Sequence, residues 1–460
     1  GYTFADFMDK ENGFWAKFDE AESDETALAN GIRRTKALIK QQILQQSDEV
    51  KLLLKVLAFF ARPVPREALE LLFPDKAQAA NPISRLTSHN LATVTTGIRG
   101  TRYYELHAYF REQTRNLPPR FEDLPEEALA SLANTWLVEG NKSYRITFYN
   151  RAITLFEWSE QIFRYLVEEK NKFELADDLA AAYLNKGSSL DNLGRMNEAI
   201  DEYDKAIEIG EELVKEKGTI ELADVLAKAY LNKGVALARL GRMNEAIDEF
   251  DKAIEILEEL VKEKERIELT NDLAGVYMNK GNAFDSLGRM NEAIDEYDKA
   301  IEIREELVKE RGRIELTNDL AGVYMNKGVA FVTVPDLENA LVCFDEGIAW
   351  REKCLARGEH HVLPDYAEDL VLRIRVLIKL EDWQLAANDV VNAFNYLPLL
   401  ESPEVPDYFK QRIGGELGKI IQLFKEVSPE NREEIYKFAG KEGKRLREFV
   451  EDFHKNSNQN

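Results

Sequence analysis

One segment of the sequence occurs three times, at residues 193–209, 240–256 and 287–303, and the copies differ only in one aromatic residue. The aromatic residue is Tyr203, Phe250 and Tyr297 in turn. The interval between copies is 47 residues both times. A unit of this size cannot bury its apolar face alone and must stack on its copies, so the sequence predicts a repeat array.

Weaker copies extend the array in both directions. The same interval connects a series of alanines and a series of glycines, which together indicate six repeats between residues 126 and 397. The alanines are Ala152, Ala199, Ala246, Ala293, Ala340 and Ala387, and the glycines are Gly140, Gly187, Gly234, Gly281 and Gly328.

Each repeat has the pattern of two helices, because small and apolar residues recur at three- and four-residue spacing in both of its halves. In the second repeat they are Tyr183, Gly187 and Leu190, followed by Ala199, Ile200, Tyr203, Ala206 and Ile207. Small residues let two helices cross closely, and the aromatic residue fills the space beside them. Residues 193–195 predict the turn between the helices, with Asn197 as N-cap of the second helix.

These positions resemble the tetratricopeptide repeat (TPR), with Trp136 at the aromatic position of the first repeat. The resemblance implies a mostly α fold, a right-handed superhelical TPR-like α-solenoid. The family's unit has about 34 residues, and here residues 211–216 replace the Pro that usually ends its second helix. We therefore expect both helices to be longer, as in the long repeats of kinesin light chains.

Charge and cysteine content limit the partners. With 84 acidic and 61 basic residues, the formal net charge is -23, which disfavours nucleic acid and suits a cationic protein partner. Cys343 and Cys354 are expected about 16 Å apart on one helix, too far for a disulfide, which fits the cytoplasm. No apolar run reaches the roughly 18 residues of a membrane span, so no membrane partner is expected.

Residues 48–118 predict a winged-helix domain that precedes the repeats at 119–397. Three helices, at 50–61, 66–73 and 77–89, are followed by two strands, at 91–95 and 103–106. Residues 1–47 have too few apolar positions for their own core, so we expect helices that dock on the next domain.

This domain resembles the winged helix of STAND-class signalling ATPases, relatives of the NB-ARC proteins. A Met-His-Asp motif follows the second strand in that family, and its His contacts the bound nucleotide. Here Leu106-His107-Ala108 occupies that place, so the resemblance implies a nucleotide sensor at His107; a helix-capping role is the alternative.

The sequence contains no Gly-x-x-x-x-Gly-Lys-Ser/Thr loop. ATP or ADP, and oligomerisation through an ATPase domain, are therefore expected only if such a domain lies upstream of Gly1. A start at Gly rather than Met suggests a piece of a longer polypeptide.

Beyond the sixth repeat, Pro398, Pro403 and Pro406 break the period. In the segment 398–460 we expect two capping helices, at 407–427 and 429–454. The second would begin with Ser428 as N-cap and Pro429 as its first residue.

The resemblance implies that the first helix of each repeat lines a concave groove. Four consecutive repeats place an asparagine two residues before the small residue, forming a ladder of Asn185, Asn232, Asn279 and Asn326, and Asn282 lies nearby. An amide both donates and accepts, so it can hold any extended peptide backbone, as kinesin-light-chain repeats do with Asn at this place. The alternative is that the ladder is a by-product of duplication. Beside it, Leu184, Leu231, Met278 and Met325 would form an apolar floor.

In the sixth repeat, the 47-residue interval places Leu372, Arg373, Val376 and Lys379 on the groove. Arg373, Arg375 and Lys379 could bind a ligand carboxylate or could balance neighbouring acids. Elsewhere Asp201 with Lys205, at i,i+4 spacing, predicts a solvated pair on the outer face.

The five histidines are scattered, Glu359-His360-His361 lacks a metal-site spacing, and no nucleophile–base motif occurs. We therefore expect no enzyme, metal or cofactor in these residues. The sequence favours a sensor that binds a protein or peptide in the groove and relays it through the winged helix. The alternatives are a generic TPR scaffold, an effector enzyme fused outside residues 1–460, or a DNA-binding regulator. The regulator would contact DNA through Arg85, His89, Arg99 and Arg102.

Overall fold

The structure is a computed structural model that describes residues 126–217, 220–262, 266–395 and 406–441, with parts of 46–106 and of 443–448. The chain forms two compact parts, residues 1–212 and 213–460, each described here by itself. His107 and the segments 1–45 and 449–460 lie outside the described residues.

The first part begins with a small mixed region. A helix, α6, precedes an antiparallel sheet of strand order β1-β3-β2, in which Val94 of β2 pairs with Tyr104 of β3. The elements are β1 (Val64–Pro65), α6 (Lys76–Ser88), β2 (Ala92–Thr96) and β3 (Arg102–Leu106). The helix and the hairpin lie where the sequence predicts them, whereas β1 was not predicted, because Pro63 and Pro65 only indicated a helix end.

Two helical hairpins complete the first part. They are α8 (Glu126–Arg145) with α9 (Tyr149–Arg164), and α10 (Ala176–Asn192) with α11 (Met196–Lys217), which runs past the boundary. A π-helical turn, η3 (Tyr165–Glu169), lengthens α9, and the 3-10 turn η4 (Phe173–Leu175) leads into α10.

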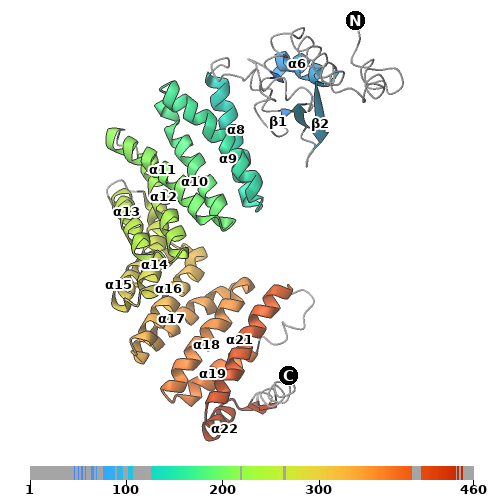
Figure 1. Ribbon diagram of the computed structural model, residues 1–460. Coiled ribbons are helices and arrows are strands. Elements are labelled where there is room, and N and C mark those ends of the chain that lie inside the picture. Colours follow the sequence, from blue (N-terminus) through green and yellow to red (C-terminus); the bar gives the residue numbers. More distant parts are fainter. Residues whose placement is uncertain are drawn as a thin grey trace, which may run out of the picture. The chain divides into compact units, whose positions relative to one another are not determined.

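The second part contains four more hairpins and a closing pair, in the residues that the structure describes. Each helix from α12 to α19 packs against the next along the chain, α21 packs on α18 and α22 on α19, and α12, α14, α16 and α18 also contact one another in turn (Figure 1). The helices are α12 (Ile220–Arg239), α13 (Met243–Lys262), α14 (Thr270–Ser286), α15 (Met290–Glu305), α16 (Thr317–Thr333), α17 (Leu337–Ala356), α18 (Leu363–Lys379), α19 (Trp383–Phe394), α21 (Asp407–Glu426) and α22 (Pro429–Phe438). The short turns are η5 (Ile267–Leu269), η6 (Glu306–Glu310), η7 (Ile314–Leu316) and η8 (His360–Val362).

A close glycine–aromatic contact holds each hairpin from the first repeat to the fifth. A Cβ atom at Gly281 would lie 2.6 Å from Cε1 of Tyr297, too close for any real side chain. The other pairs are Gly140–Phe156, Gly187–Tyr203, Gly234–Phe250 and Gly328–Phe344. The sequence interpretation of small residues at close helix crossings is confirmed.

The turn inside a repeat needs a left-handed residue, which explains its glycine. Gly194, Gly241 and Gly288 have φ between +74° and +78°, a region that a residue without Cβ enters at little cost. The predicted N-cap is wrong, however. Helix α11 begins at Met196, so Asn197 is its second residue, and in the equivalent helix α15 the N-cap Arg289 makes no side-chain capping bond.

The closing pair follows the prediction at its start and departs from it at its end. The side chain of Ser428 accepts a hydrogen bond from the Asn431 amide, with Pro429 as the first helical residue of α22. Helix α22 ends at Phe438, before Gly440 with φ +58°, so the predicted helix is interrupted there; the described residues among 441–448 are again helical, and 449–454 lie outside the described residues. A single apolar cluster joins α18 and α19 to α21 and α22, including Leu370, Ile374 and Phe424.

The sixth repeat is one residue out of register with the predicted interval. Helix α16 begins at Thr317 and α18 at Leu363, a difference of 46 residues rather than 47. Ile374, not Arg375, therefore occupies the place of Gly328. The groove positions of this repeat become Val371, Leu372, Arg375 and Ile378, which corrects the assignment of Arg373, Val376 and Lys379.

Candidate ligand-binding face

The first helices of the third to sixth repeats, α12, α14, α16 and α18, form one layer of the second part. At the groove positions each carries a row of residues that are half-exposed or, for Arg375, exposed. We call this surface the first-helix face. Its residues are Leu231, Asn232, Val235 and Ala238; Met278, Asn279, Asn282 and Asp285; Asn326, Val329 and Val332; and Leu372, Arg375 and Ile378.

The predicted apolar floor is only partly available. Met325 is buried, with its sulfur against Gly347 of α17, and Leu184 in the first part is buried as well. The Sδ atom of Met278 lies 3.6 Å from a guanidinium nitrogen of Arg304. Leu231 and Met278 remain half-exposed, so two of the four floor positions are open to a ligand and two are buried.

The asparagine ladder is not uniform. The amide nitrogen of Asn326 donates to Oδ1 of Asn282 at 3.1 Å, and the Tyr297 hydroxyl donates to the same oxygen at 2.8 Å. Asn232 also has a polar contact. Among the described residues, the side chains of Asn185 and Asn279 have no hydrogen-bond partner, so they retain both donor and acceptor for a ligand.

A second ladder, which the sequence analysis missed, runs directly beside the asparagines. Lys280 of α14 lies 2.7 Å from Asp251 of the preceding repeat and 2.9 Å from the buried Glu296 of its own. The equivalent cations are Lys186, Lys233, Lys327 and Arg373, each paired with a carboxylate. Burial alone would lower the pKa of Lys280, but Asp251 and Glu296 outweigh it and raise that pKa.

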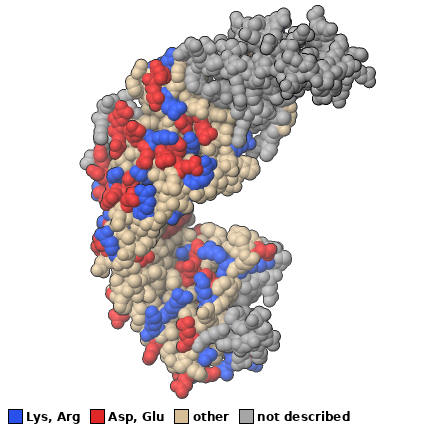
Figure 2. Space-filling view, in the orientation of Figure 1, with Lys and Arg blue, Asp and Glu red and all other residues tan. Residues whose placement is uncertain are grey.

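These ladders correct the prediction of solvated charge pairs. Lys205 pairs at i,i+3 spacing with Glu202, 2.9 Å away, not with Asp201. Glu202 is buried and lies 3.2 Å from Lys186. The same arrangement occurs in the next two repeats at Glu249 and Glu296. On the face drawn in Figure 2, acidic and basic side chains lie side by side over much of the surface.

Arg373, in the sixth repeat, is the last member of this cation series and does not face a ligand. Its guanidinium donates to both carboxylate oxygens of Asp389, at 2.8 and 2.5 Å, and to Asp345 at 2.7 Å. Burial lowers the pKa of Arg373, but the two acids outweigh burial and raise it. Of the two roles predicted for Arg373, the structure therefore supports balancing neighbouring acids and not binding a ligand carboxylate.

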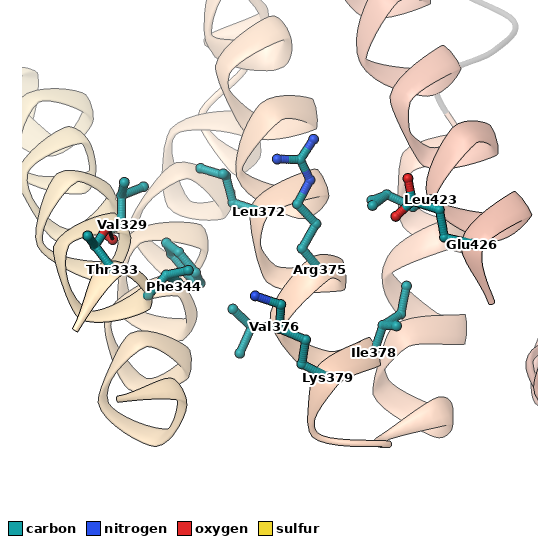
Figure 3. Close-up of a pocket in the computed structure, with 11 residues that line it drawn as sticks. Val329, Thr333, Phe344, Leu372, Arg375, Val376, Ile378, Lys379, Leu423 and Glu426 are labelled. Atoms are coloured by element: carbon teal, nitrogen blue, oxygen red, sulfur yellow. Dashed lines mark hydrogen bonds between the residues drawn. The ribbon is translucent and has the colours of Figure 1, made fainter. Parts of the chain in front are cut away.

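Arg375 and Lys379 differ from Arg373. Both are exposed, and neither has a hydrogen-bond or ion-pair partner among the described residues. They border a cleft of about 500 Å³. Figure 3 shows α18 between α16 and α21, with the side chain of Arg375 running along α18 and that of Glu426 pointing from α21 toward α18. The lining residues are Val329, Val332, Thr333, Phe344, Leu372, Arg375, Val376, Ile378, Lys379, Leu423 and Glu426. We call this site the end cleft.

Other kinds of site find no support in the described residues. No group of His, Cys, Asp or Glu there could hold a metal ion, and no helix there is long and apolar enough to cross a membrane. Both cysteines are free and buried, and burial raises the pKa of the Cys343 thiol to about 11, which keeps it protonated and unreactive.

Comparison with known proteins identifies the repeats. Residues 180–211, 227–257 and 274–307 match the family model of the tetratricopeptide repeat, so these three segments, in α10–α11, α12–α13 and α14–α15 with η6, are tetratricopeptide repeats. A comparison with curated proteins gives no match.

Several solved structures resemble the chain weakly. BtubC (BKLC) from P. vanneervenii is 20% identical, over 56% of this chain and 94% of that chain, with a TM-score of 0.44. The apo form of RapI is 17% identical, over 66% and 99%, with a TM-score of 0.41. YrrB, described as a TPR protein with an unusual peptide-binding site, is 16% identical, over 47% and 85%, with a TM-score of 0.30. At these TM-scores the likeness carries no functional argument.

Proposed function

We propose that this chain is a protein-interaction module that holds an extended segment of a partner protein on the first-helix face of its second part. The observation that carries the proposal is the end cleft of about 500 Å³, which has both apolar and unpaired charged groups. Ligand sites typically combine an apolar surface with a few polar groups that fix orientation.

The first-helix face offers a continuation of that site. Asn279 has a free side-chain amide, and Val329 and Leu372 follow on the next two first helices. A free amide can donate to and accept from a peptide backbone, while the cleft takes a side chain. The face is therefore suited to a peptide in extended form rather than to a compact small molecule.

A matched pair of valine substitutions tests the proposal. Peptides are selected from a displayed random library on the immobilised chain, and their affinities are measured by fluorescence anisotropy. Val329→Arg places a long cation in the end cleft, whereas Val342→Arg changes a 60% exposed residue of α17 outside the cleft. We expect Val329→Arg to weaken binding about tenfold or more, because a lost side-chain pocket costs roughly 1–3 kcal/mol. Equal binding by both variants, or no selected peptide, would refute the proposal.

The finer proposal is that peptide binding is relayed to a nucleotide-switch domain of STAND type, in the cytoplasm. It is supported by helix α6, by the antiparallel pair β2 and β3, and by the place of His107 directly after β3. Hydrogen exchange with and without a selected peptide tests the relay. We expect altered protection from hydrogen exchange in residues 48–118 when peptide occupies the second part. Unchanged protection there would contradict the relay and favour a TPR scaffold without a switch.

A binding experiment with the same protein tests the alternative that the chain is a DNA-binding regulator. Arg102 begins β3 and Arg85 lies in the last turn of α6. Binding through such cations would be salt-dependent. Anisotropy of labelled duplex DNA at two salt concentrations should show no binding by the native chain; salt-dependent binding lost in Arg85→Gln with Arg102→Gln would favour the DNA-binding regulator instead.

A further inference from the structure

The end cleft lies at a seam in the core of the second part. Its inner wall contains Phe344 and Val376, which are buried in a cluster with Met325 and Ala340. Its outer wall contains Ile378 and Leu423, which pack at the border of the larger cluster under α21. Because the two clusters do not merge here, an apolar side chain from a partner could fill the space between them.

Of the two cations at the cleft, Arg375 is peculiar to the sixth repeat, whereas the place of Lys379 is also taken by a cation, Arg239, in the third repeat. Arg375 occupies the place of Val235, Asn282 and Val329 in the preceding repeats, given the 46-residue step. Lys379 takes the place of Thr333. The cation series that pairs internally is complete without them, because Arg373 already binds Asp389 and Asp345. Two positive charges are therefore left at the cleft.

A single carboxylate gives the cleft a direction. Glu426 of α21 is exposed at the wall opposite α18 and makes no ion pair with Arg375 or Lys379 among the described contacts. The lining thus carries two cations and one anion. An anionic ligand group is attracted toward α18 and repelled from α21.

The charge of the whole chain limits how acidic the partner can be. At a formal net charge of -23, the rest of the surface repels a long acidic tract, and this repulsion acts within about 10 Å at moderate salt. The locally positive cleft favours one acidic side chain within an otherwise neutral segment. A planar guanidinium beside an ammonium suits a carboxylate.

We propose that the end cleft binds a partner peptide through one acidic residue next to a bulky apolar residue, with the carboxylate on Arg375 and Lys379 and the apolar side chain between Val329 and Leu372. This assignment rests on the proposed function and specifies the chemistry of its ligand. The capping helix α21 is then part of the binding site as well as the closure of the core.

Defined peptide pools test the proposal. Labelled decapeptides carry a fixed Leu beside a fixed Glu, Gln or Lys, with neutral residues elsewhere, and binding to the full chain is followed by anisotropy. We expect the Glu pool to bind about fivefold more tightly than the Gln pool and the Lys pool to bind most weakly, as for a partly buried charge-assisted contact. The preference should shrink as salt is raised.

Variants locate the preference. Arg375→Gln with Lys379→Gln should make the Glu and Gln pools equal. The matched control is Lys252→Gln with Lys299→Gln, the same charge change on second helices, where each Lys pairs with a glutamate; it should keep the preference. Glu426→Gln should tighten binding of the Glu pool about twofold, because it removes a repulsive charge. Circular dichroism of each variant checks its folding.

Two results would overturn the assignment: equal binding of the Glu and Gln pools by the native chain, or a preference that survives loss of both cations. If library-selected peptides still lose affinity on Val329→Arg in those cases, only the acidic specificity fails. If no peptide binds or Val329→Arg has no effect, the proposed function fails with it.

Discussion

The hydroxyl of Tyr297 on α15 donates a hydrogen bond of 2.8 Å to Oδ1 of Asn282 on α14. The same oxygen accepts the side-chain amide of Asn326 on α16, so the contact joins two repeats. The equivalent pair in the fifth repeat is Val329 with Phe344. The amide and the hydroxyl are thus present together or absent together in these two repeats.

Removing the hydroxyl alone should cost more than removing both polar groups. Tyr297→Phe leaves Asn282 without its nearer donor, which costs about 1 kcal/mol. Asn282→Val combined with Tyr297→Phe recreates the apolar pair of the fifth repeat and should recover part of that loss. Urea unfolding followed by circular dichroism measures the double-mutant cycle. Strictly additive losses in the cycle would contradict this account.

Two glycine substitutions should change stability in opposite directions. Gly281→Ala forces a methyl group into the ring of Tyr297, and such overpacking costs about 1–3 kcal/mol. Gly415 is exposed within α21 and has nothing within 4 Å of a Cβ, so Gly415→Ala should stabilise by about 0.5–1 kcal/mol through backbone entropy. Thermal unfolding of both variants provides the measurement. Destabilisation by Gly415→Ala would show that helix propensity does not govern α21.

The repeat architecture could be predicted from sequence because its determinants are local. Gly187 and Tyr203 stand at fixed spacing in one hairpin, and Gly194 marks the turn, so their roles follow from periodicity and side-chain size. The register of the sixth repeat could not be found in this way. Ala386 and Ala387 are adjacent, so an interval of 46 or of 47 residues finds an alanine.

The lysine ladder was missed for a different reason. Lys280 pairs with Asp251, 29 residues earlier, and with Glu296, 16 residues later, whereas sequence patterns show charges only within one helix. The sequence likewise could not show that the side chain of Met325 points into the core and not onto the groove. The methionine packs on Gly347 of the neighbouring helix, a space that helical periodicity does not reveal.

Loss of Lys280 should destabilise the array far more than loss of an exposed lysine. Lys280→Met leaves the buried Glu296 with Lys299 as its one remaining cation and leaves Asp251 without its cation. Because breaking a buried ion pair costs up to about 5 kcal/mol, we expect a loss of stability no larger than that. The control Lys262→Met removes an exposed partner of Glu258, worth at most about 0.5 kcal/mol. Urea midpoints compare the two. Similar shifts would mean that the ladder is fully screened by water.

The pH dependence of stability should report on Asp369 of α18, which is 3% exposed. Burial raises the pKa of this carboxyl to about 7, although its hydrogen bond from Arg351 opposes the rise. The folded state therefore holds this proton more tightly than the unfolded state, so the group's contribution to stability is complete below about pH 4 and lost as pH rises through about 7.

Asp369→Asn removes that titration and keeps an acceptor for Arg351. The free energy of unfolding of the native chain should therefore fall, relative to that of Asp369→Asn, between about pH 4 and pH 7. Urea titrations at pH 4, 5.5, 7 and 8 measure the difference. The control is Asp319→Asn, at an exposed position of α16; we expect the unfolding free energies of the native chain and of this variant to differ by the same amount at every pH. A difference that stays constant, or rises, across this range would show that Arg351 keeps Asp369 ionised throughout.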